Sequence, residues 1–471
     1  MSMLALLKNP FRQSNLIIAA ILVLALLIGA AMPIYAGMMD DQIAKLAALP
    51  AMLLFAILLL YDRKLTLTLI ILVRAGGDNI LELTRFSLGG YQIGVGGLIN
   101  AAVILISIML MLERPKTLSK NVVVVWSVFL LLSLYGILVS PAKPEALRSW
   151  LALLSYFSIF SSAFHFINNK EDFRFCVKLA LFSSALPVLY SFIDIALNHG
   201  QGGEEGFRLR STFSHPNVLA FYLTLIIPMT FYILKSMPVG KNGLTRLFLG
   251  CYLFLLLGLL ILTKTRSAWI ACVITFALYG VFFERRYLVY MVVLGVVALF
   301  IPGVADRLSD LGSGNEVVTY GKLNSFAWRV YIWESAWHWA GPSHYLQGYG
   351  LQSFKELSIV FFPSAGKLKW GAHSVYVQLL FEMGLLGVGI FLYLYVQVLR
   401  EFRKLFSFDR LAGFFLVLVV LNFLICAFSD NMLDYLSFNW YLWFILGAGC
   451  AFVQTHAAPV RAQAAPFAAQ G

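Results

Sequence analysis

Long uninterrupted apolar runs dominate the chain and set its predicted elements. A helix needs about 20 apolar residues to cross a bilayer. Runs of roughly that length recur along the chain and are separated by polar connections. They cover 15–36, 43–61, 94–112, 121–140, 147–167, 173–197, 217–235, 244–262, 267–283, 287–303, 375–399, 411–429 and 436–455. The pattern predicts an all-α polytopic membrane protein with about 12–14 transmembrane helices.

A shorter apolar run at 65–75 decides the predicted orientation. It could be a short span, a re-entrant piece or an interfacial helix. If it crosses, most Lys and Arg residues fall in connections on one side, which the positive-inside rule assigns to the cytoplasm. If it does not cross, every later connection flips and the charge bias inverts. With the run crossing, the cations in short outer connections are Arg74, Arg85, Lys143, Arg148, Arg208, Arg210, Lys264 and Arg266.

One outer connection, at 304–372, is too long for a simple loop. Trp328, Trp333 and Trp337 follow one another in it at helical spacing, which favours an amphipathic helix lying on the membrane. The loop is too short to bury much core as an independent domain. We therefore expect a transmembrane bundle with outer Arg loops at 1–303, a long outer loop at 304–372, transmembrane helices at 373–455 and a disordered cytoplasmic tail at 456–471.

Composition supports the membrane assignment and narrows the partners. The 471 residues are 60% hydrophobic and 12% charged, whereas soluble domains carry about 25% charged residues. The net charge of +12 is explained by cytoplasmic loops, so no nucleic-acid partner is expected. The cysteines lie in apolar runs and form no C-x-x-C pair, which predicts small core residues. The first run is longer than a signal-peptide core, which predicts a retained span.

Several cofactor signatures are absent from the sequence. There is no G-x-x-x-x-G-K-[ST] phosphate loop and no H-E-x-x-H zinc motif. The glycine-rich stretch 89–97 opens a membrane span, so a turn or close helix packing explains it better than a nucleotide site. The sequence therefore predicts neither a metal site nor a cofactor.

Two pairs of outer cations are candidates for binding an anion. Arg208 and Arg210 stand just before a span, and guanidinium groups suit a diphosphate because they bind phosphate oxygens in pairs. They could instead anchor the interface. Ser214 could cap the following helix, and Pro216 is typical of a helix start. Lys264 and Arg266 lie in a minimal outer turn, where they oppose the charge bias, so an anionic ligand is the natural compensation.

The remaining polar candidates also fall on the outer side. His373 stands where the long loop re-enters the membrane, and an imidazole can take a proton from a hydroxyl. A lone histidine is often structural, and His338 and His344 in the same loop compete for the role. Arg329 lies on the predicted loop helix. Carboxylates at the outer end of a late span could orient a histidine or pair with an arginine; these are Asp430 and Asp434.

Together these motifs resemble the O-antigen ligase and O-antigen polymerase superfamily. The resemblance covers about 200–455 and rests on the order of the motifs and on their shared outer side. The motifs are Arg-x-x-x-Thr-Phe-x-x-Pro-Asn at 208–217, Thr-Arg-Ser at 265–267, Arg-x-x-x-Trp at 329–333, Gly-Tyr-Gly at 348–350 and His-x-x-Tyr-x-x-x-x-x-Glu-x-Gly-x-x-Gly at 373–387. The family usually has Asn after the histidine, where this chain has Ser374, and Gly where it has Ser211.

The resemblance implies a metal-independent glycosyltransferase of the bacterial inner membrane, with a GT-C-like fold. Such enzymes move a glycan from undecaprenyl diphosphate to an acceptor hydroxyl at the periplasmic face. It implies that Arg208 and Arg266, with Arg210 beside them, hold the diphosphate and that His373 is the base. Arg329, Tyr376 and Asp430 are possible supporting residues.

The sequence leaves three readings of the function open. A ligase would transfer the glycan to a lipid A-core acceptor, and a polymerase would extend one carrier-linked glycan with another. The absence of a large outer domain argues mildly against a protein acceptor, and we lean slightly towards a polymerase. The alternative is a lipid-linked oligosaccharide transporter or flippase, which the scarcity of charge at span centres weakens.

Overall fold

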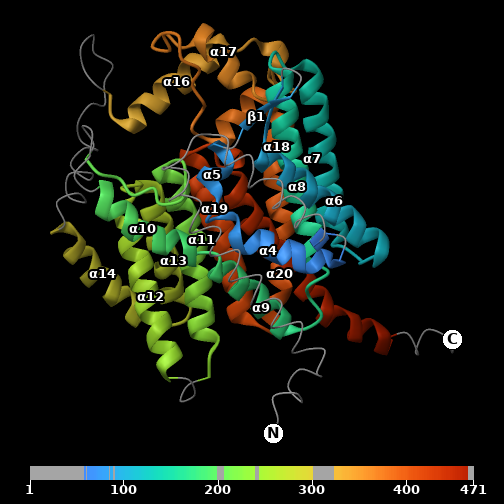
Figure 1. The fold of residues 1–471 in the computed structure, drawn as a ribbon, viewed down its shortest axis with the longest axis vertical. Coiled ribbons are helices and arrows are strands. Elements are labelled where there is room, and N and C mark those ends of the chain that lie inside the picture. Colours follow the sequence, from blue (N-terminus) through green and yellow to red (C-terminus); the bar gives the residue numbers. More distant parts are fainter. Residues whose placement is uncertain are drawn as a thin grey trace.

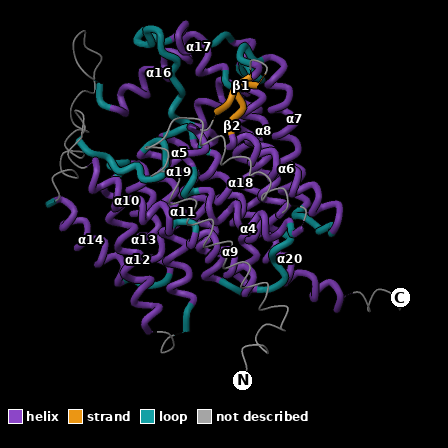
Figure 2. Tube along the Cα trace, in the orientation of Figure 1, coloured by secondary structure: helices purple, strands orange, loops and turns teal. Residues whose placement is uncertain are grey.

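The computed structural model describes residues 58–59, 61–83, 85–88, 91–198, 206–238, 243–300 and 323–464. The predicted span 15–36, nearly all of 43–61 and the first part of the long loop lie outside these ranges. Figure 2 shows that helices make up nearly all of the described chain, with one strand hairpin near one end. The chain is an all-α polytopic membrane protein, as the apolar runs predict.

The helical bundle follows the apolar runs closely, and Figure 1 shows its arrangement. A two-stranded antiparallel hairpin, β1 (Arg85–Leu88) with β2 (Tyr91–Gly94), precedes α6. The helices of the bundle are α4 (Arg63–Arg74), α5 (Asp78–Leu83), α6 (Val95–Glu113), α7 (Lys120–Val139), α8 (Lys143–Ala163), α9 (Lys170–Phe182), α10 (Ala185–Asn198), α11 (Pro216–Ser236), α12 (Gly243–Leu262), α13 (Arg266–Phe282), α14 (Arg286–Leu299), α18 (Val375–Arg403), α19 (Arg410–Ser429) and α20 (Leu436–Ala464).

Eight helical segments in the described ranges are long and apolar enough to cross a membrane. The predicted span 173–197 is one of them, but it is broken into α9 and α10. Ser183 and Ser184 lie at the break, and their hydroxyls bond back to the carbonyls of Ala180 and Leu181. Such bonds compete with the helical ladder and bend the chain.

Several predicted boundaries differ from the structure, and the local sequence explains two of them. α8 begins at Lys143, four residues before the predicted 147, since Pro144 in the first turn suits a helix start. α20 continues to Ala464, so the tail expected to be disordered from 456 begins as helix. The Ala-rich sequence favours that continuation, because Ala has the highest helix propensity. Residues 465–471 lie outside the described ranges.

One end of the bundle, here called the cationic end, carries the basic connections. Ion pairs join its segments: Arg63 to Glu113, Lys170 to Asp409 at 2.7 Å and Lys404 to Glu401 at 2.7 Å. The opposite end, here called the loop end, carries α16 (Ser325–Trp339) and α17 (Ser353–Phe361), at the top of Figure 1. The basic connections counted by the charge bias therefore lie at the end opposite to the long loop.

The short run at 65–75 forms α4, which is only 12 residues long. Its start lies at the cationic end, where the Lys64 ammonium donates to the carbonyl of His165. Its end approaches the loop end, where the Ala75 carbonyl accepts from the Thr212 hydroxyl and Asn79 N–H donates to the Thr212 carbonyl. α4 and α5 together therefore connect the two ends, which favours the crossing alternative.

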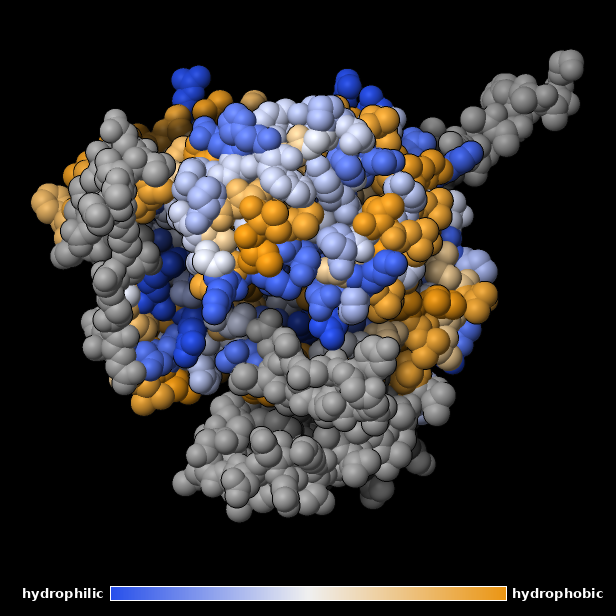
Figure 3. Space-filling view, turned by 90° about the horizontal axis from the view of Figure 1, so that it is seen from above, coloured by the Kyte–Doolittle hydropathy of each residue, from blue (hydrophilic) through white to orange (hydrophobic). Residues whose placement is uncertain are grey.

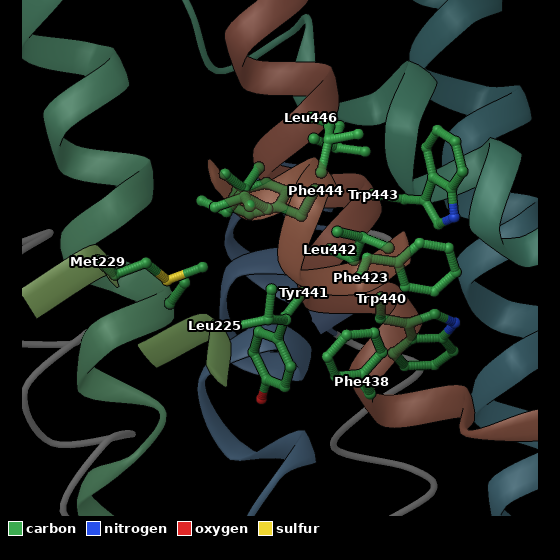
Figure 4. Close-up of a cluster of buried hydrophobic side chains, with 14 of the residues drawn as sticks. Leu225, Met229, Phe423, Phe438, Trp440, Tyr441, Leu442, Trp443, Phe444 and Leu446 are labelled. Carbon is green, nitrogen blue, oxygen red and sulfur yellow. The ribbon is translucent and has the colours of Figure 1, made fainter. Parts of the chain in front are cut away.

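The core of the bundle surrounds α20, whose aromatic residues are drawn in Figure 4. Trp440, Tyr441, Trp443 and Phe444 are each at most 1% exposed. The Trp443 ring meets Trp126 edge to face at 4.6 Å. Buried aromatic pairs contribute about 0.5–1.5 kcal/mol beyond area burial. α20 is thus the rigid axis whose first turns lie under the loop end.

The long loop packs more firmly than an isolated surface helix would. Ile332 and Ala336 on α16 are buried against Phe354 and Phe361 of α17 and against Phe381 of α18. This small core corrects the expectation that α16 simply lies on the membrane, although Trp337 remains 52% exposed on its other side. The aromatic residues of α17 and α18 cover the buried side of α16, which the spacing of the tryptophans in the sequence did not reveal.

Glycines dock the loop into a break in α18. Gly384 has a φ of +65°, which interrupts the helix, and the Gly350 N–H donates to the Glu382 carbonyl at 2.8 Å. A Cβ at Gly348 would lie 2.3 Å from the Glu382 backbone, and one at Gly384 equally close to the Leu346 backbone. The Gly-Tyr-Gly and Glu-x-Gly motifs therefore fit one another and fix the loop above the start of α18.

Candidate functional site

The arginine-bearing segment before α11 is an ordered loop held by a buried carboxylate. Asp194 accepts from the backbone N–H groups of Arg210, at 3.1 Å, and Ser211, at 2.8 Å. Ser211 adopts a φ of +55°, a conformation that favours glycine, and its hydroxyl donates to the Pro187 carbonyl. These bonds hold Ser211 in that conformation.

Arg208 ties this loop to the short turn before α13. Its Nε donates to the Thr263 carbonyl at 3.0 Å, and its Nη2 donates to the Asn217 side-chain oxygen at 2.8 Å. The Thr265 hydroxyl donates to the same oxygen at 3.2 Å. Arg266 is the first residue of α13, directly after this turn. The two predicted cationic elements therefore meet at the loop end.

Asp430 is the next residue in this series of hydrogen bonds, after Arg208 and Asn217. Asn217 donates from Nδ2 to Asp430 Oδ2 at 2.7 Å, while the Tyr435 hydroxyl donates to Oδ1 at 2.8 Å. The Asn431 backbone N–H also donates to Oδ1, at 2.8 Å. Asp430 is 2% exposed, so these donors satisfy a carboxylate that burial would otherwise penalise.

His373 faces the same carboxylate from the re-entry of the long loop. Its Nδ1 lies 3.7 Å from Asp430 Oδ1, longer than a hydrogen bond but close enough for attraction. The backbone on both sides is fixed: Trp333 donates to the Ala372 carbonyl at 2.6 Å, and Ser374 N–H donates to Asn431 Oδ1 at 3.0 Å. His373 itself has a φ of +49°, and its ring meets Trp328 edge to face.

A positive φ at a non-glycine residue is costly and is maintained when the surroundings over-determine it. Here the strained residue is the histidine that faces a buried carboxylate. We call Arg208, Asn217, Asp430, Tyr435 and His373 the Asp430 network.

Opposite charges influence one another in and around the network. Burial raises the pKa of Asp430, but His373, Asn217 and Tyr435 outweigh burial, so the pKa lies below its ordinary value. Burial lowers the pKa of Arg329 and Arg266 lowers it further, while Asp430 and Tyr435 oppose the change. Arg329 therefore shares the field of Arg266 and Asp430, and the long loop brings a third arginine to the site.

Three predicted participants lie apart from the network. The Arg210 side chain is exposed, and its backbone N–H serves Asp194. The Tyr376 hydroxyl donates to the Leu424 carbonyl at 2.7 Å, a contact between α18 and α19. Asp434 lines a cavity together with Tyr435.

The rival histidines have other surroundings. His338 is exposed on α16, and His344 stacks on Tyr349 with ring centroids 3.9 Å apart. Among the three histidines of the loop, His373 is the one beside a carboxylate within the described chain.

The helix cap before α11 corrects one expectation. The N-cap is His215, whose side chain accepts from Asn217 N–H, rather than Ser214. Pro216 occupies the first helical position as predicted. The cap residue is shifted by one because proline at that position places His215 immediately before it.

Sequence reasoning assigned no role to Asn217 or Tyr435. Asn217 ends the Pro-Asn motif, so the motif already marked it, but its double contact to Arg208 and Asp430 depends on tertiary packing. Tyr435 follows Asp434 at the start of α20, where spacing alone gives no hint of a bond to Asp430.

Within the described ranges, no group of three or more His, Cys, Asp or Glu side chains is placed to hold a metal ion. Four of the cysteines are buried as small core residues, and Cys251 is exposed on α12.

Comparison with known families falls on this part of the chain. Residues 251–394 match the family model for O-antigen ligase. The match confirms the resemblance to the O-antigen ligase and polymerase superfamily. It includes the turn with Arg266, the long loop with Arg329, and His373, while Arg208 and Asp430 flank it in sequence. A search of curated proteins found no match to this chain.

The geometry shows what the matched segment contributes to the loop end. It brings Arg266, Arg329 and His373, and the flanking chain completes the site with Arg208, Asn217 and Asp430. An anion held by the arginines would lie beside the imidazole. The arrangement can therefore stabilise negative charge and accept a proton at neighbouring points.

Proposed function

We propose that this protein transfers a glycan from undecaprenyl diphosphate to an acceptor hydroxyl at the periplasmic face of the bacterial inner membrane. The approach of His373 to Asp430, which Asn217 joins to Arg208, carries this proposal. It sets a base next to a cluster of arginines. The family match supports a ligase or polymerase that acts on lipid-linked glycans.

The step that this arrangement favours is displacement at the anomeric carbon. The acceptor oxygen bonds to that carbon as its proton passes to His373, and the bond from the carbon to the diphosphate oxygen breaks. Asp430 orients Nδ1 and stabilises the imidazolium, which leaves Nε2 to receive the proton. Arg208, Arg266 and Arg329 balance the charge that grows on the diphosphate, without a metal in the step. The exposed Arg210 side chain contacts the margin of the diphosphate.

The proposed orientation follows from the separation of charge. The basic connections gather at one end of the bundle, and the positive-inside rule places that end in the cytoplasm. The Asp430 network lies at the opposite end. Figure 3 looks onto that end, where hydrophilic residues gather with hydrophobic ones among them. A lipid-linked donor and a water-soluble glycan can meet on such a face.

A gel of surface glycans from a deletion strain tests this proposal. Loss of long chains, with single units still reaching lipid A, identifies a polymerase. Full-length chains that stay on the carrier and never reach lipid A identify a ligase. Normal chains with carrier-linked units trapped in the cytoplasm would contradict the proposal and favour a flippase.

A further inference from the structure

A second polar site shares Tyr435 with the Asp430 network. A cavity of about 470 Å³ opens there between α4, α5, α6, α8, α11 and the start of α20. Its volume falls in the range of about 300–1,000 Å³ that small-molecule pockets occupy. The residues that give it its character are Arg74, Asp78, Gly97, Arg148, Asp434 and Ser437. We call it the Asp434 cavity.

The charges of the Asp434 cavity balance. Arg74 pairs with Asp78 at 2.9 Å, and both are almost fully buried. Arg148 and Asp434 add one group of each sign to the wall. The Asp430 network differs, because Arg208 belongs to it and Arg329 shares the field of Arg266 and Asp430 beside it, so cations outnumber the one carboxylate. A balanced set of donors and acceptors suits sugar hydroxyls, which both donate and accept, better than it suits a diphosphate.

The wall also holds a hydroxyl that needs a partner. Ser437 is 1% exposed, and its Oγ has no hydrogen-bond partner among the described residues. A buried hydroxyl without a partner costs about 1–3 kcal/mol. Asp434 is surrounded by protein, yet its side chain is exposed to the cavity, where its oxygens can accept.

The glycines at the start of α6 leave room on one wall. Gly94, Gly96 and Gly97 all line the cavity. A Cβ built at Gly97 meets no described atom within 4 Å. Part of the glycine-rich stretch therefore serves as an open wall, which neither helix packing nor a nucleotide site explains.

Resting on the function proposed above, we propose that the Asp434 cavity binds uncharged, hydroxyl-rich sugar residues of a glycan substrate. Tyr435 lines the cavity and also bonds to Asp430, the carboxylate that His373 faces, so this one residue belongs to both sites. The sugars belong either to the acceptor or to the first units of the donor glycan. Both sources present the same hydroxyl chemistry to this wall.

The first test fills the cavity from its open wall. Gly97→Trp adds bulk, and Gly250→Trp is the matched control, since a Cβ at Gly250 on α12 also meets no described atom within 4 Å. Each variant is expressed in the deletion strain, and surface glycan is compared at equal protein level. We expect Gly97→Trp to lower the amount of product at least about tenfold, because the tryptophan would displace a sugar and so remove at least one hydrogen bond to a charged group of the wall. Gly250→Trp should leave the amount of product unchanged.

A binding measurement assigns the cause of that loss. The purified full-length variants in nanodiscs are titrated with undecaprenyl diphosphate and with the same lipid carrying one neutral sugar. Unchanged affinity of Gly97→Trp for the bare lipid supports the proposal. If the variant loses only the extra affinity for the sugar-bearing lipid, the sugars belong to the donor; if it loses neither, they belong to the acceptor. Weaker binding of the bare lipid would overturn the proposal.

A second pair of variants covers the case in which Gly97→Trp does not accumulate in the membrane. Arg148→Gln removes a cation from the wall without adding bulk, and Lys143→Gln changes an exposed cation of the same helix that does not line the cavity. Loss of product in Arg148→Gln alone supports the cavity. Equal product in both would overturn it. Failure of the wild-type protein to bind undecaprenyl diphosphate would instead count against the proposed function.

Discussion

Two neighbouring carboxylates, Asp430 and Asp434, stand in opposite surroundings although one helical turn of sequence separates them. Asp430 is wrapped by donors and faces His373, and its pKa lies below the ordinary value. Asp434 lies beside the second cavity, where burial raises its pKa to about 6 despite opposing contributions from Lys355, Gln378 and Gln352. Carboxylates with diverging pKa values serve different roles. The surroundings of Asp430 favour its charged form, whereas Asp434 lies beside a cavity whose wall carries charges of both signs.

The largest expected effect comes from the base on the charged side. His373→Ala should lower glycan transfer by about 10²–10⁴-fold, since that is what general base catalysis contributes. Surface glycan in the deletion strain provides the measurement, with membrane insertion checked on the same samples. His338→Ala, an exposed histidine of α16, is the control and should keep transfer. Near-normal product from His373→Ala would remove the proposed role of His373.

The arginines should divide into a strong pair and a weaker neighbour. Arg208→Ala and Arg266→Ala should each weaken binding of undecaprenyl diphosphate by about 10–100-fold, because hydrogen bonds to charged groups contribute roughly 1.5–3 kcal/mol. Arg210→Ala should have a smaller effect, since its side chain is exposed at the margin. Titration in nanodiscs separates the three. Equal losses of affinity for undecaprenyl diphosphate in all three variants would show that the exposure of the Arg210 side chain does not distinguish its role from those of Arg208 and Arg266.

Tyr435 belongs to both the Asp430 network and the Asp434 cavity, and its substitution should have an intermediate effect on the rate of glycan transfer. Tyr435→Phe deletes the hydroxyl that donates to Asp430 Oδ1 and should slow transfer by about 2–10-fold, the size of one net hydrogen bond. The effect should fall on turnover while donor affinity stays unchanged. Tyr376→Phe also removes a hydroxyl, but one that bonds to the Leu424 carbonyl, and should leave turnover unchanged. The comparison fails if Tyr376→Phe is as slow as Tyr435→Phe.

The smallest effect should appear in stability as a function of pH. A carboxyl with a raised folded pKa stabilises the fold below its unfolded value, and that contribution is lost as pH rises through about 6. The wild-type Tm in nanodiscs should therefore fall by about 1–2 °C between pH 5 and 7 on account of Asp434, a small change because solvent in the cavity screens the charge. Asp434→Asn should remove that part of the slope.

Asp430 provides the contrast within the same experiment. Its lowered pKa means that its contribution persists above its ordinary value and is lost only as pH falls below it. Glu145→Gln, an exposed change on α8, is the control and should retain the wild-type slope. A wild-type slope in Asp434→Asn would show that this carboxyl does not titrate in the range.

The fold was largely predictable because membrane spans depend on local composition. α6, α7, α11 and α19 match the predicted runs within one or two residues, since apolar length alone defines them. The break between α9 and α10 was not predicted, because the tyrosines that bond to Ser183 and Ser184 come from other helices. The small core under α16 was missed for the same reason.

The candidate site was predictable in its charged members and not in its connections. Arg208 and Arg266 stood out because cations in short outer connections oppose the charge bias, and Arg329 stood out because it lies on the predicted loop helix. His373 stood out at the re-entry, but three histidines competed for the role. The contact that distinguishes His373 from the other two, its approach to Asp430, comes from the packing of the chain and is not encoded locally in the sequence. The cavity beside Asp434 was invisible because six elements build it.

The central claim is that the Asp430 network moves a glycan off a lipid diphosphate. Membranes of the deletion strain, which retain their own carrier-linked glycan, are mixed with purified wild-type protein or with His373→Ala, and undecaprenyl diphosphate is quantified by mass spectrometry. The account predicts that the wild-type protein releases undecaprenyl diphosphate in step with transferred glycan and that His373→Ala releases almost none. Equal release by both proteins, or release of the lipid monophosphate instead, would contradict it.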